Sequence, residues 1–181
     1  MGKSINIRKV EVNDANILAY IQVESWKSAF NKILSKEDLD KYTNINKSIV
    51  MYNRIIKENI GNGFILTIDE EPHCIAYWDK ARDEEMEGYA EVICIHSLCN
   101  NWGKGYGTEM MNYILRDIKS AGFSKVMLWV FEQNSRARKF YEKHGFVLTE
   151  KSKKFSNAIE VMYCKDLDPS GPGNFQVQDR G

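Results

Sequence analysis

The stretch Glu91–Ala121, EVICIHSLCNNWGKGYGTEMMNYILRDIKSA, decides the fold. Its apolar run, Val92–Leu98, predicts a buried strand. A polar turn and three alternate glycines follow, and they lead into apolar residues at helical spacing, which are Met110, Met111, Ile114, Leu115 and Ile118. The stretch therefore predicts a strand, a glycine loop and an amphipathic helix, in that order.

The glycines of this loop, Gly103, Gly105 and Gly107, favour an anion site. Glycine has no Cβ, so its backbone N–H groups approach a ligand closely and its φ angle is free. Unpaired donors and the positive end of the helix dipole favour a phosphate at a helix N-terminus, and Lys104 adds a mobile positive charge. A plain glycine turn is the alternative. The G-x-x-x-x-G-K-[ST] and G-x-G-x-x-G patterns are absent.

The composition predicts a single domain, and it supports neither a membrane-spanning segment nor a nucleic-acid partner. With 181 residues, the chain is long enough to bury a core. No apolar run approaches the roughly 18 residues of a membrane span, and the N-terminus has no signal-peptide apolar segment, so we expect a cytoplasmic protein. The 25 Lys and Arg residues balance the 25 Asp and Glu residues, which gives a nucleic-acid partner no electrostatic support.

The cysteines and histidines predict no metal site. The four cysteines contain no C-x-x-C pair, and free thiols are the better interpretation. The three histidines are scattered, and none pairs with a cysteine or an acid at a zinc-ligand spacing.

The rest of the chain predicts a mixed α/β sheet. We expect helices after Asp14, which can cap the first of them, and after Ser35 in a capping box. Another helix, capped by Asn134 or Ser135, should run up to the stop at Gly145. A further helical face ends near Gly61. The predicted strands are Ile5–Val10, Phe64–Ile68, His73–Trp78, Glu87–Leu98, Val126–Phe131, Phe146–Leu148 and Ile159–Cys164. Beyond residue 167 the tail has no apolar period and is predicted to be disordered.

Two motifs in this order resemble those of the GNAT superfamily of acetyl-CoA-dependent N-acetyltransferases. The [Q/R]-x-x-G-x-[G/A] signature falls on residues 102–107, and N-x-x-A-x-x-F-Y-x-x-x-G-F is complete from Asn134 to Phe146. The resemblance covers roughly residues 5–166. It implies a single acetyltransferase domain, residues 1–167, with a mainly antiparallel twisted sheet of about seven strands, flanked by helices and split into a V between the fourth and fifth strands.

The resemblance implies acetyl-CoA as cosubstrate and assigns the residues that bind it. Backbone groups of the strand end would pair with the pantetheine arm, loop N–H groups would hold the diphosphate, and Asn134 would bond the pantetheine end. The cofactor-binding residues implied are Ile95, His96, Ser97, Gly103, Lys104, Gly105, Tyr106, Gly107, Thr108 and Asn134. Arg136, Arg138 and Lys139 either reach the 3′-phosphate or form a solvated helix face. Trp102 departs from the usual Gln or Arg, which puts one side-chain contact in doubt.

The implied reaction is the attack of a primary amine on the thioester. An amine with a pKa of about 10 must lose a proton first. Glu91 is the candidate base, because it lies eleven residues before Trp102, where histone-modifying members of the family have a glutamate. It enters an apolar run, where partial desolvation would raise its pKa. Glu24 and His96 are alternative bases. Tyr141 resembles the family's general acid, and packing alone is its alternative role.

The predicted function is acetyl transfer to the amine of an unidentified small molecule or peptide in a ternary complex. A catalytically silent CoA-binding sensor is the alternative. The acidic run Asp83–Glu85 would suit a cationic acceptor if it lay at the mouth of the cleft. Dimers are common in the family, although nothing in this sequence demands a homodimer.

Overall fold

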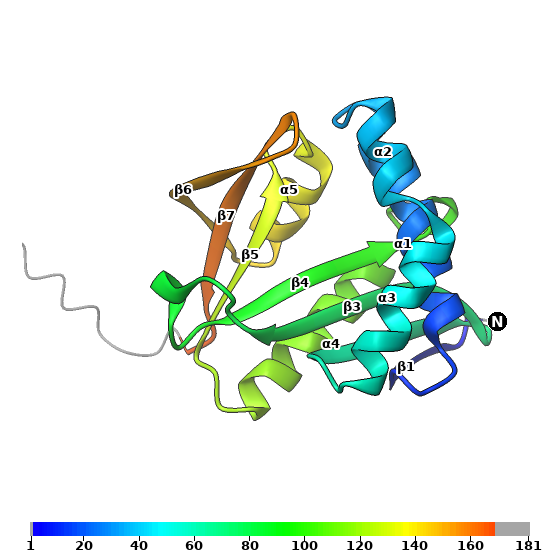
Figure 1. Ribbon diagram of the computed structural model, residues 1–181. Coiled ribbons are helices and arrows are strands. Elements are labelled where there is room, and N and C mark those ends of the chain that lie inside the picture. Colours follow the sequence, from blue (N-terminus) through cyan, green and yellow to red (C-terminus); the bar gives the residue numbers. More distant parts are fainter. Residues whose placement is uncertain (1, 169–181) are drawn as a thin grey trace, which may run out of the picture.

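The strands and helices of the chain follow one another in the order that the sequence predicts (Figure 1). The computed structural model describes residues 2–168. The strands are β1 (Ile5–Lys9), β2 (Asn62–Ile68), β3 (Glu71–Lys80), β4 (Ala90–Ser97), β5 (Lys125–Phe131), β6 (Val147–Phe155) and β7 (Ala158–Asp166). The helices are α1 (Ala15–Phe30), α2 (Lys36–Tyr42), α3 (Ile45–Lys57), α4 (Tyr106–Ser120) and α5 (Ser135–Lys143), with short 3₁₀ turns η1 (Glu84–Met86) and η2 (Cys99–Asn101).

The strands form one seven-stranded sheet in the order β1-β2-β3-β4-β5-β7-β6. Every neighbouring pair is antiparallel except β4 and β5, which run parallel. That parallel pairing is short, because only Ala90 with Val126 and Glu91 with Met127 are in register. Beyond Glu91 the two strands separate, as Figure 1 shows. The predicted sheet and its split between the fourth and fifth strands are therefore confirmed.

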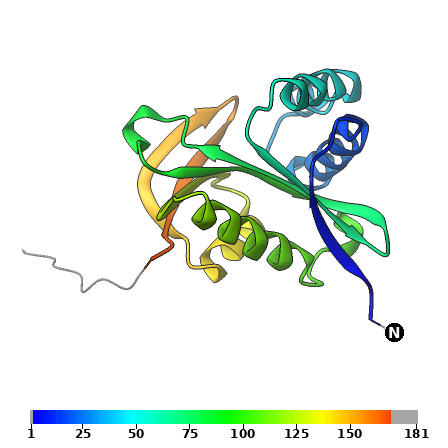
Figure 2. The same cartoon turned by 90° about the horizontal axis from the view of Figure 1, so that it is seen from below.

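Helices cover both faces of the sheet (Figure 2). Side chains alternate across a strand, so neighbouring residues of β2 enter different cores. Phe64 and Leu66 pack on the α4 side with Met110, whereas Ile65 packs on the α1 side with Leu18. Because both faces are buried, β2 has the nearly continuous apolar sequence of a central strand.

The side-chain caps expected for two of the helices are present. The Ser35 hydroxyl accepts from the Asp38 N–H at the start of α2, and the Asn134 side chain accepts from the Ala137 N–H at the start of α5. Gly145 ends α5 with a φ of 80°, a left-handed conformation that glycine adopts without strain.

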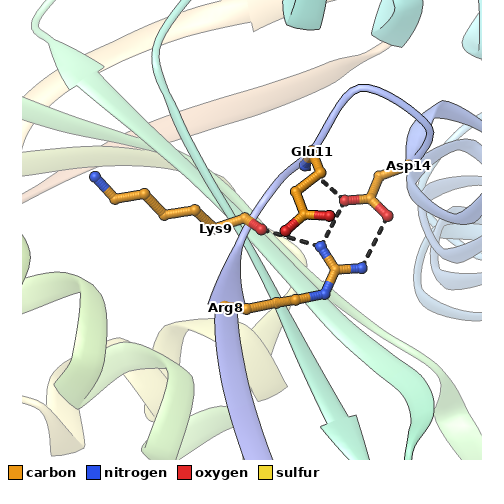
Figure 3. Close-up of polar contacts among 4 residues, drawn as sticks. All are labelled: Arg8, Lys9, Glu11 and Asp14. Atoms are coloured by element: carbon orange, nitrogen blue, oxygen red, sulfur yellow. Dashed lines mark hydrogen bonds and ion pairs between the residues drawn. The ribbon is translucent and has the colours of Figure 1, made fainter.

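Asp14 precedes α1, but its side chain does not cap the helix as expected. Its carboxylate instead accepts hydrogen bonds from the guanidinium of Arg8, at 2.6 and 2.8 Å, and from the Glu11 N–H at 2.7 Å (Figure 3). The Arg8 guanidinium binds the carboxylate more strongly than the backbone N–H groups of the helix would. Asp14 therefore connects α1 to β1 and does not cap the helix.

Three further sequence predictions concern the cysteines, a membrane span and the C-terminal tail. The four cysteines are free thiols, as predicted. Within residues 2–168, no helix has the length and apolar character needed to span a bilayer. The predicted disordered tail falls almost entirely on residues 169–181, outside the described residues, so that expectation and the proposed domain boundary remain predictions.

Candidate active site

The gap between β4 and β5 exposes backbone groups at the end of β4. The Leu98 N–H donates to the His73 carbonyl of β3 at 3.1 Å. Backbone groups of successive strand residues alternate in direction, so the N–H groups of Ser97 and Ile95 point to the other side, into the gap. These are the two residues expected to pair with the pantetheine arm.

A cavity of about 350 Å³ lies beside this strand end. Ile95 and Ser97 form part of its wall, as do the glycine loop and the first turn of α4. The opposite wall is α5, with Arg136, Phe140 and Tyr141. The two motifs of the sequence thus line one cavity, although about thirty residues separate them in the chain.

The glycine loop offers a row of unpaired backbone donors. Among the described residues, the N–H groups of residues 103–107 have no hydrogen-bond partner. Gly103 and Gly105 have φ values of 77° and 91°, which only glycine adopts readily. The Thr108 N–H differs from the expectation, because it already donates to the Gly105 carbonyl at 2.9 Å. The loop and the positive end of the α4 dipole together fit a diphosphate.

Trp102 connects the glycine loop to α5. Its indole Nε1 donates to the carbonyl and to the hydroxyl of Ser97, both at 3.0 Å. The guanidinium carbon of Arg136 lies 3.4 Å from the centroid of the indole ring, a cation–π contact. From the sequence, Arg136, Arg138 and Lys139 are all candidates to reach a phosphate. Of these three residues, only Arg136 lines the cavity.

Tyr141 lines the cavity from α5 and packs edge-on against Phe140 and Phe146. Burial raises the pKa of its phenol well above the usual value, with a further contribution from Cys94. The hydroxyl therefore stays protonated at neutral pH and can donate a proton or a hydrogen bond.

His73 is a cavity residue that the sequence analysis missed. Leu66 pairs with Cys74 and Thr67 with Pro72, so His73 is the extra residue of a β-bulge. It is only 3% exposed and packs on Tyr106, and its Nδ1 has no partner among residues 2–168. Burial, then Lys104 and Lys3, lower its pKa. Pro72 was the available signal, since proline interrupts regular strand pairing.

Glu91 lies outside the cavity, in an ion pair with Arg82. Its carboxylate is 3% exposed and accepts from the Arg82 guanidinium at 2.6 and 3.0 Å and from the Arg82 N–H at 3.1 Å. Burial would raise its pKa, but the hydrogen bonds and the charge of Arg82 outweigh burial, and the pKa is lowered. The expected upward shift is therefore wrong.

Three other predicted site residues also make contacts elsewhere. His96 faces α1, where its Nε2 accepts from Trp26 at 3.4 Å, and burial lowers its pKa to about 4. The Lys104 ammonium donates to Asn101 at 2.8 Å. Asn134 uses its side-chain oxygen to cap α5. Their roles toward a cofactor remain predictions.

Comparison with known sequences identifies the family. The profile of the acetyltransferase (GNAT) family matches residues 23–146. The chain belongs to this family. It is therefore an acyltransferase whose cosubstrate is acetyl-CoA. The chain is also 23% identical over 133 residues to the uncharacterized N-acetyltransferase YuaI of Bacillus subtilis, a match covering 72% of this chain and 73% of that one.

Solved structures of acetyltransferases share the fold. The PaiA N-acetyltransferase of Thermoplasma acidophilum, in complex with coenzyme A, has a TM-score of 0.76 and 21% identity, covering 90% of this chain and 99% of that chain. The putative acetyltransferase yncA of Salmonella typhimurium, with acetyl-CoA, has a TM-score of 0.67 and 13% identity, covering 94% of this chain and 98% of that chain. These identities support a common fold and no more.

Proposed function

We propose that this GNAT enzyme transfers the acetyl group of acetyl-CoA to a primary amine by direct attack in a ternary complex. One observation carries the proposal: the N–H groups of residues 103–107 have no partner within the described chain and stand at the wall of a cavity. The diphosphate of the cofactor would satisfy them, and the α4 dipole favours its negative charge. Backbone groups of Ile95 and Ser97 would then pair with the pantetheine arm.

Tyr141 is the proposed general acid. A departing thiolate, whose thiol has a pKa of about 8.5, is a better leaving group when a donor stands beside it. The buried phenol keeps its proton at neutral pH and lines the cofactor cavity. The Ile95 N–H would stabilise the oxyanion of the tetrahedral intermediate.

Glu91 is the proposed acceptor of the amine proton. Its lowered pKa keeps it ionised at neutral pH, so it is free to accept a proton. In the free enzyme the Glu91 carboxylate already accepts two hydrogen bonds from the Arg82 guanidinium. The amine proton would therefore reach Glu91 through water. His96, whose imidazole is neutral above a pKa of about 4, is the alternative on the same side of β4.

The amine would approach from the α1 side of the sheet. Aromatic rings in mutual contact line that side, namely Trp26, Phe30, Tyr42, Phe131 and Phe155. The acidic run expected to attract a cation is partly neutralised, because Glu85 pairs with Lys151. These contacts support an acceptor with an apolar portion beside its amine. The free cysteines support a cytoplasmic location.

A thiol-release assay tests the function. The enzyme is incubated with acetyl-CoA and a panel of small amines, amino acids and peptide N-termini, and CoA is measured with a thiol reagent. We expect amine-dependent release with at least one class, and a kcat about 100-fold lower in Tyr141→Phe with unchanged acetyl-CoA binding. Binding of CoA without turnover on any amine would indicate a sensor. Absence of CoA binding at millimolar concentration would overturn the proposal.

A further inference from the structure

Arg136 is an exposed residue whose guanidinium lies against an aromatic ring. It stands in the first turn of α5 and lines the cofactor cavity. Within residues 2–168, its guanidinium makes no hydrogen bond or ion pair, and its contact is the face of Trp102, at 3.4 Å. Arg138, two residues along, instead donates to the Tyr163 hydroxyl and the Glu132 carbonyl. Arg136 therefore keeps its donors available.

Trp102 fixes the position of that guanidinium. The two Nε1 hydrogen bonds to Ser97 hold the indole ring against the end of β4. A stacked guanidinium touches the ring with its flat face, so the N–H groups at its edge stay free to donate to phosphate oxygens. Burial lowers the pKa of Arg136, but the usual value is far above neutrality, and the side chain remains a cation.

We propose that Arg136, held on the Trp102 ring, binds the diphosphate of acetyl-CoA and supplies the cationic side chain that position 102 does not. This inference rests on the proposed function and assigns a binding residue within it. The diphosphate is the phosphate concerned, because Arg136 shares its cavity with the unpaired N–H groups of Gly103, Gly105 and Gly107. Trp102 acts as a positioning residue, and its own N–H is already used by Ser97.

The first experiment measures cofactor affinity by calorimetry for the parent enzyme and Arg136→Gln. CoA and dephospho-CoA, which lacks the 3′-phosphate, are the ligands. Loss of a charge-assisted hydrogen bond weakens binding by about 10- to 100-fold, and we expect the same factor for both ligands. Arg116→Gln is the matched control, because Arg116 is an exposed arginine beside the Tyr113 ring, outside the cavity. We expect less than about a twofold change there.

The outcomes separate the alternatives. A loss seen with CoA and absent with dephospho-CoA would assign Arg136 to the 3′-phosphate and overturn the inference, as would unchanged binding of both ligands. A parent enzyme that binds neither ligand would instead refute the proposed function. Thermal melts of each variant identify any that fails to fold, and Arg136→Lys, which keeps the charge without the flat face, serves as a second variant with an expected intermediate loss.

The second experiment tests the role of the ring with a double-mutant cycle. Trp102→Ala removes the stacking surface, and we expect CoA affinity to fall about 5-fold or more while Arg136 is present. In the Arg136→Gln background the same change should have little further effect, because the ring then has no cation to position. Trp102→Phe, which keeps an aromatic face, should lie between them. Additive losses would show that the two residues act separately and would overturn the positioning role.

Discussion

At the scale of single residues, Glu91 is subject to two opposing influences. Burial in the sheet destabilises its charge, and the Arg82 guanidinium stabilises it through two side-chain hydrogen bonds. Arg82 prevails, so the pKa of Glu91 is lowered and the carboxylate is ionised at neutral pH. A proton acceptor with this pKa is always available but takes a proton only weakly.

Glu91 and Arg82 therefore make a paired prediction for the pH–rate profile. The folded pKa of Glu91 lies below its usual value of 4.5, so any acidic limb that it causes lies below pH 4.5. In Arg82→Gln, burial is no longer offset, and we expect this limb to move upward in pH. In Glu91→Gln, kcat should fall about 100-fold or more across the profile. Steady-state rates from pH 4 to 9 measure both variants.

A purely structural ion pair would behave differently. Both variants would then lower the melting temperature to a similar extent, and neither would move the acidic limb. That pattern would direct the search for a base to His96.

Single residues also show where sequence reasoning stops. The loop glycines and Asn134 were predictable, because a positive φ and a helix cap are local demands with their own preferred residue types. The positions of Arg136 and His73 were not, since one depends on a ring from another motif and the other on a bulge set by pairing with β2. The contact of Arg136 leaves no local pattern in the sequence, whereas the signal for His73 is Pro72, a residue that interrupts regular strand pairing.

At the scale of elements, the start of α1 depends on an ion pair with β1. Arg8 and Asp14 are six residues apart, and their fork of two hydrogen bonds fixes the turn between strand and helix (Figure 3). The hydrogen bonds of Arg8 lower the pKa of Asp14 in spite of burial. Because α1 carries Trp26 into the aromatic cluster, this corner also supports the acceptor side of the site.

Asp14→Asn should lower the free energy of unfolding by about 1–3 kcal/mol at pH 7, because the buried carboxylate, whose side chain is 7% exposed, no longer accepts hydrogen bonds from the Arg8 guanidinium. A lowered folded pKa stabilises the protein above the unfolded value, near 3.8, and the contribution disappears as the pH falls through the folded pKa. The difference between parent and variant, measured by urea unfolding at decreasing pH, should shrink accordingly.

The exposed Lys36–Asp40 pair of α2 provides the control, since both side chains face solvent. Asp40→Asn should change stability by about 0.5 kcal/mol or less. Equal effects of the two substitutions would contradict the structural role of Asp14.

The predicted bounds of the strands and helices agree with the structure where the apolar pattern of the sequence is clear. The core strands and α4 were predictable from their periodicity, whereas β6 runs to Phe155, well past the predicted Leu148. Its second half is mostly lysine and serine on the outer edge of the sheet, and it pairs with β7 through its backbone. Such an edge strand has few apolar residues to reveal it.

At the scale of the whole molecule, the sheet consists of two parts with a short connection. β1 to β4 form one part, β5 to β7 the other, and two residue pairs in parallel register join them (Figure 1). The cavity lies where the parts separate, and its walls include the end of β4, the glycine loop and α5. Binding should therefore order the open edge of β4 as well as the glycine loop.

Amide hydrogen exchange gives a direct measurement of this effect. We expect peptides containing Ile95, Ser97 and residues 103–107 to exchange at least about 10-fold more slowly with saturating CoA, because their N–H groups gain partners. The segment Val126–Leu128, already paired within the sheet, is the internal control. Slower exchange spread evenly over both regions would indicate general stabilisation and contradict a local binding site.

The position of β7 also governs the order in which this enzyme takes shape during translation. Residues 158–166 leave the ribosome after every other strand, yet they lie between β5 and β6 and pair with both. Until they emerge, the pairing of β5 within the sheet is limited to two residue pairs with β4. The nascent chain thus completes the glycine loop early, whereas α5, the opposite wall of the coenzyme cleft, gains its hydrogen bonds to Tyr163 of β7 only at the end. A message cut short before this strand yields a cleft with one unsupported wall.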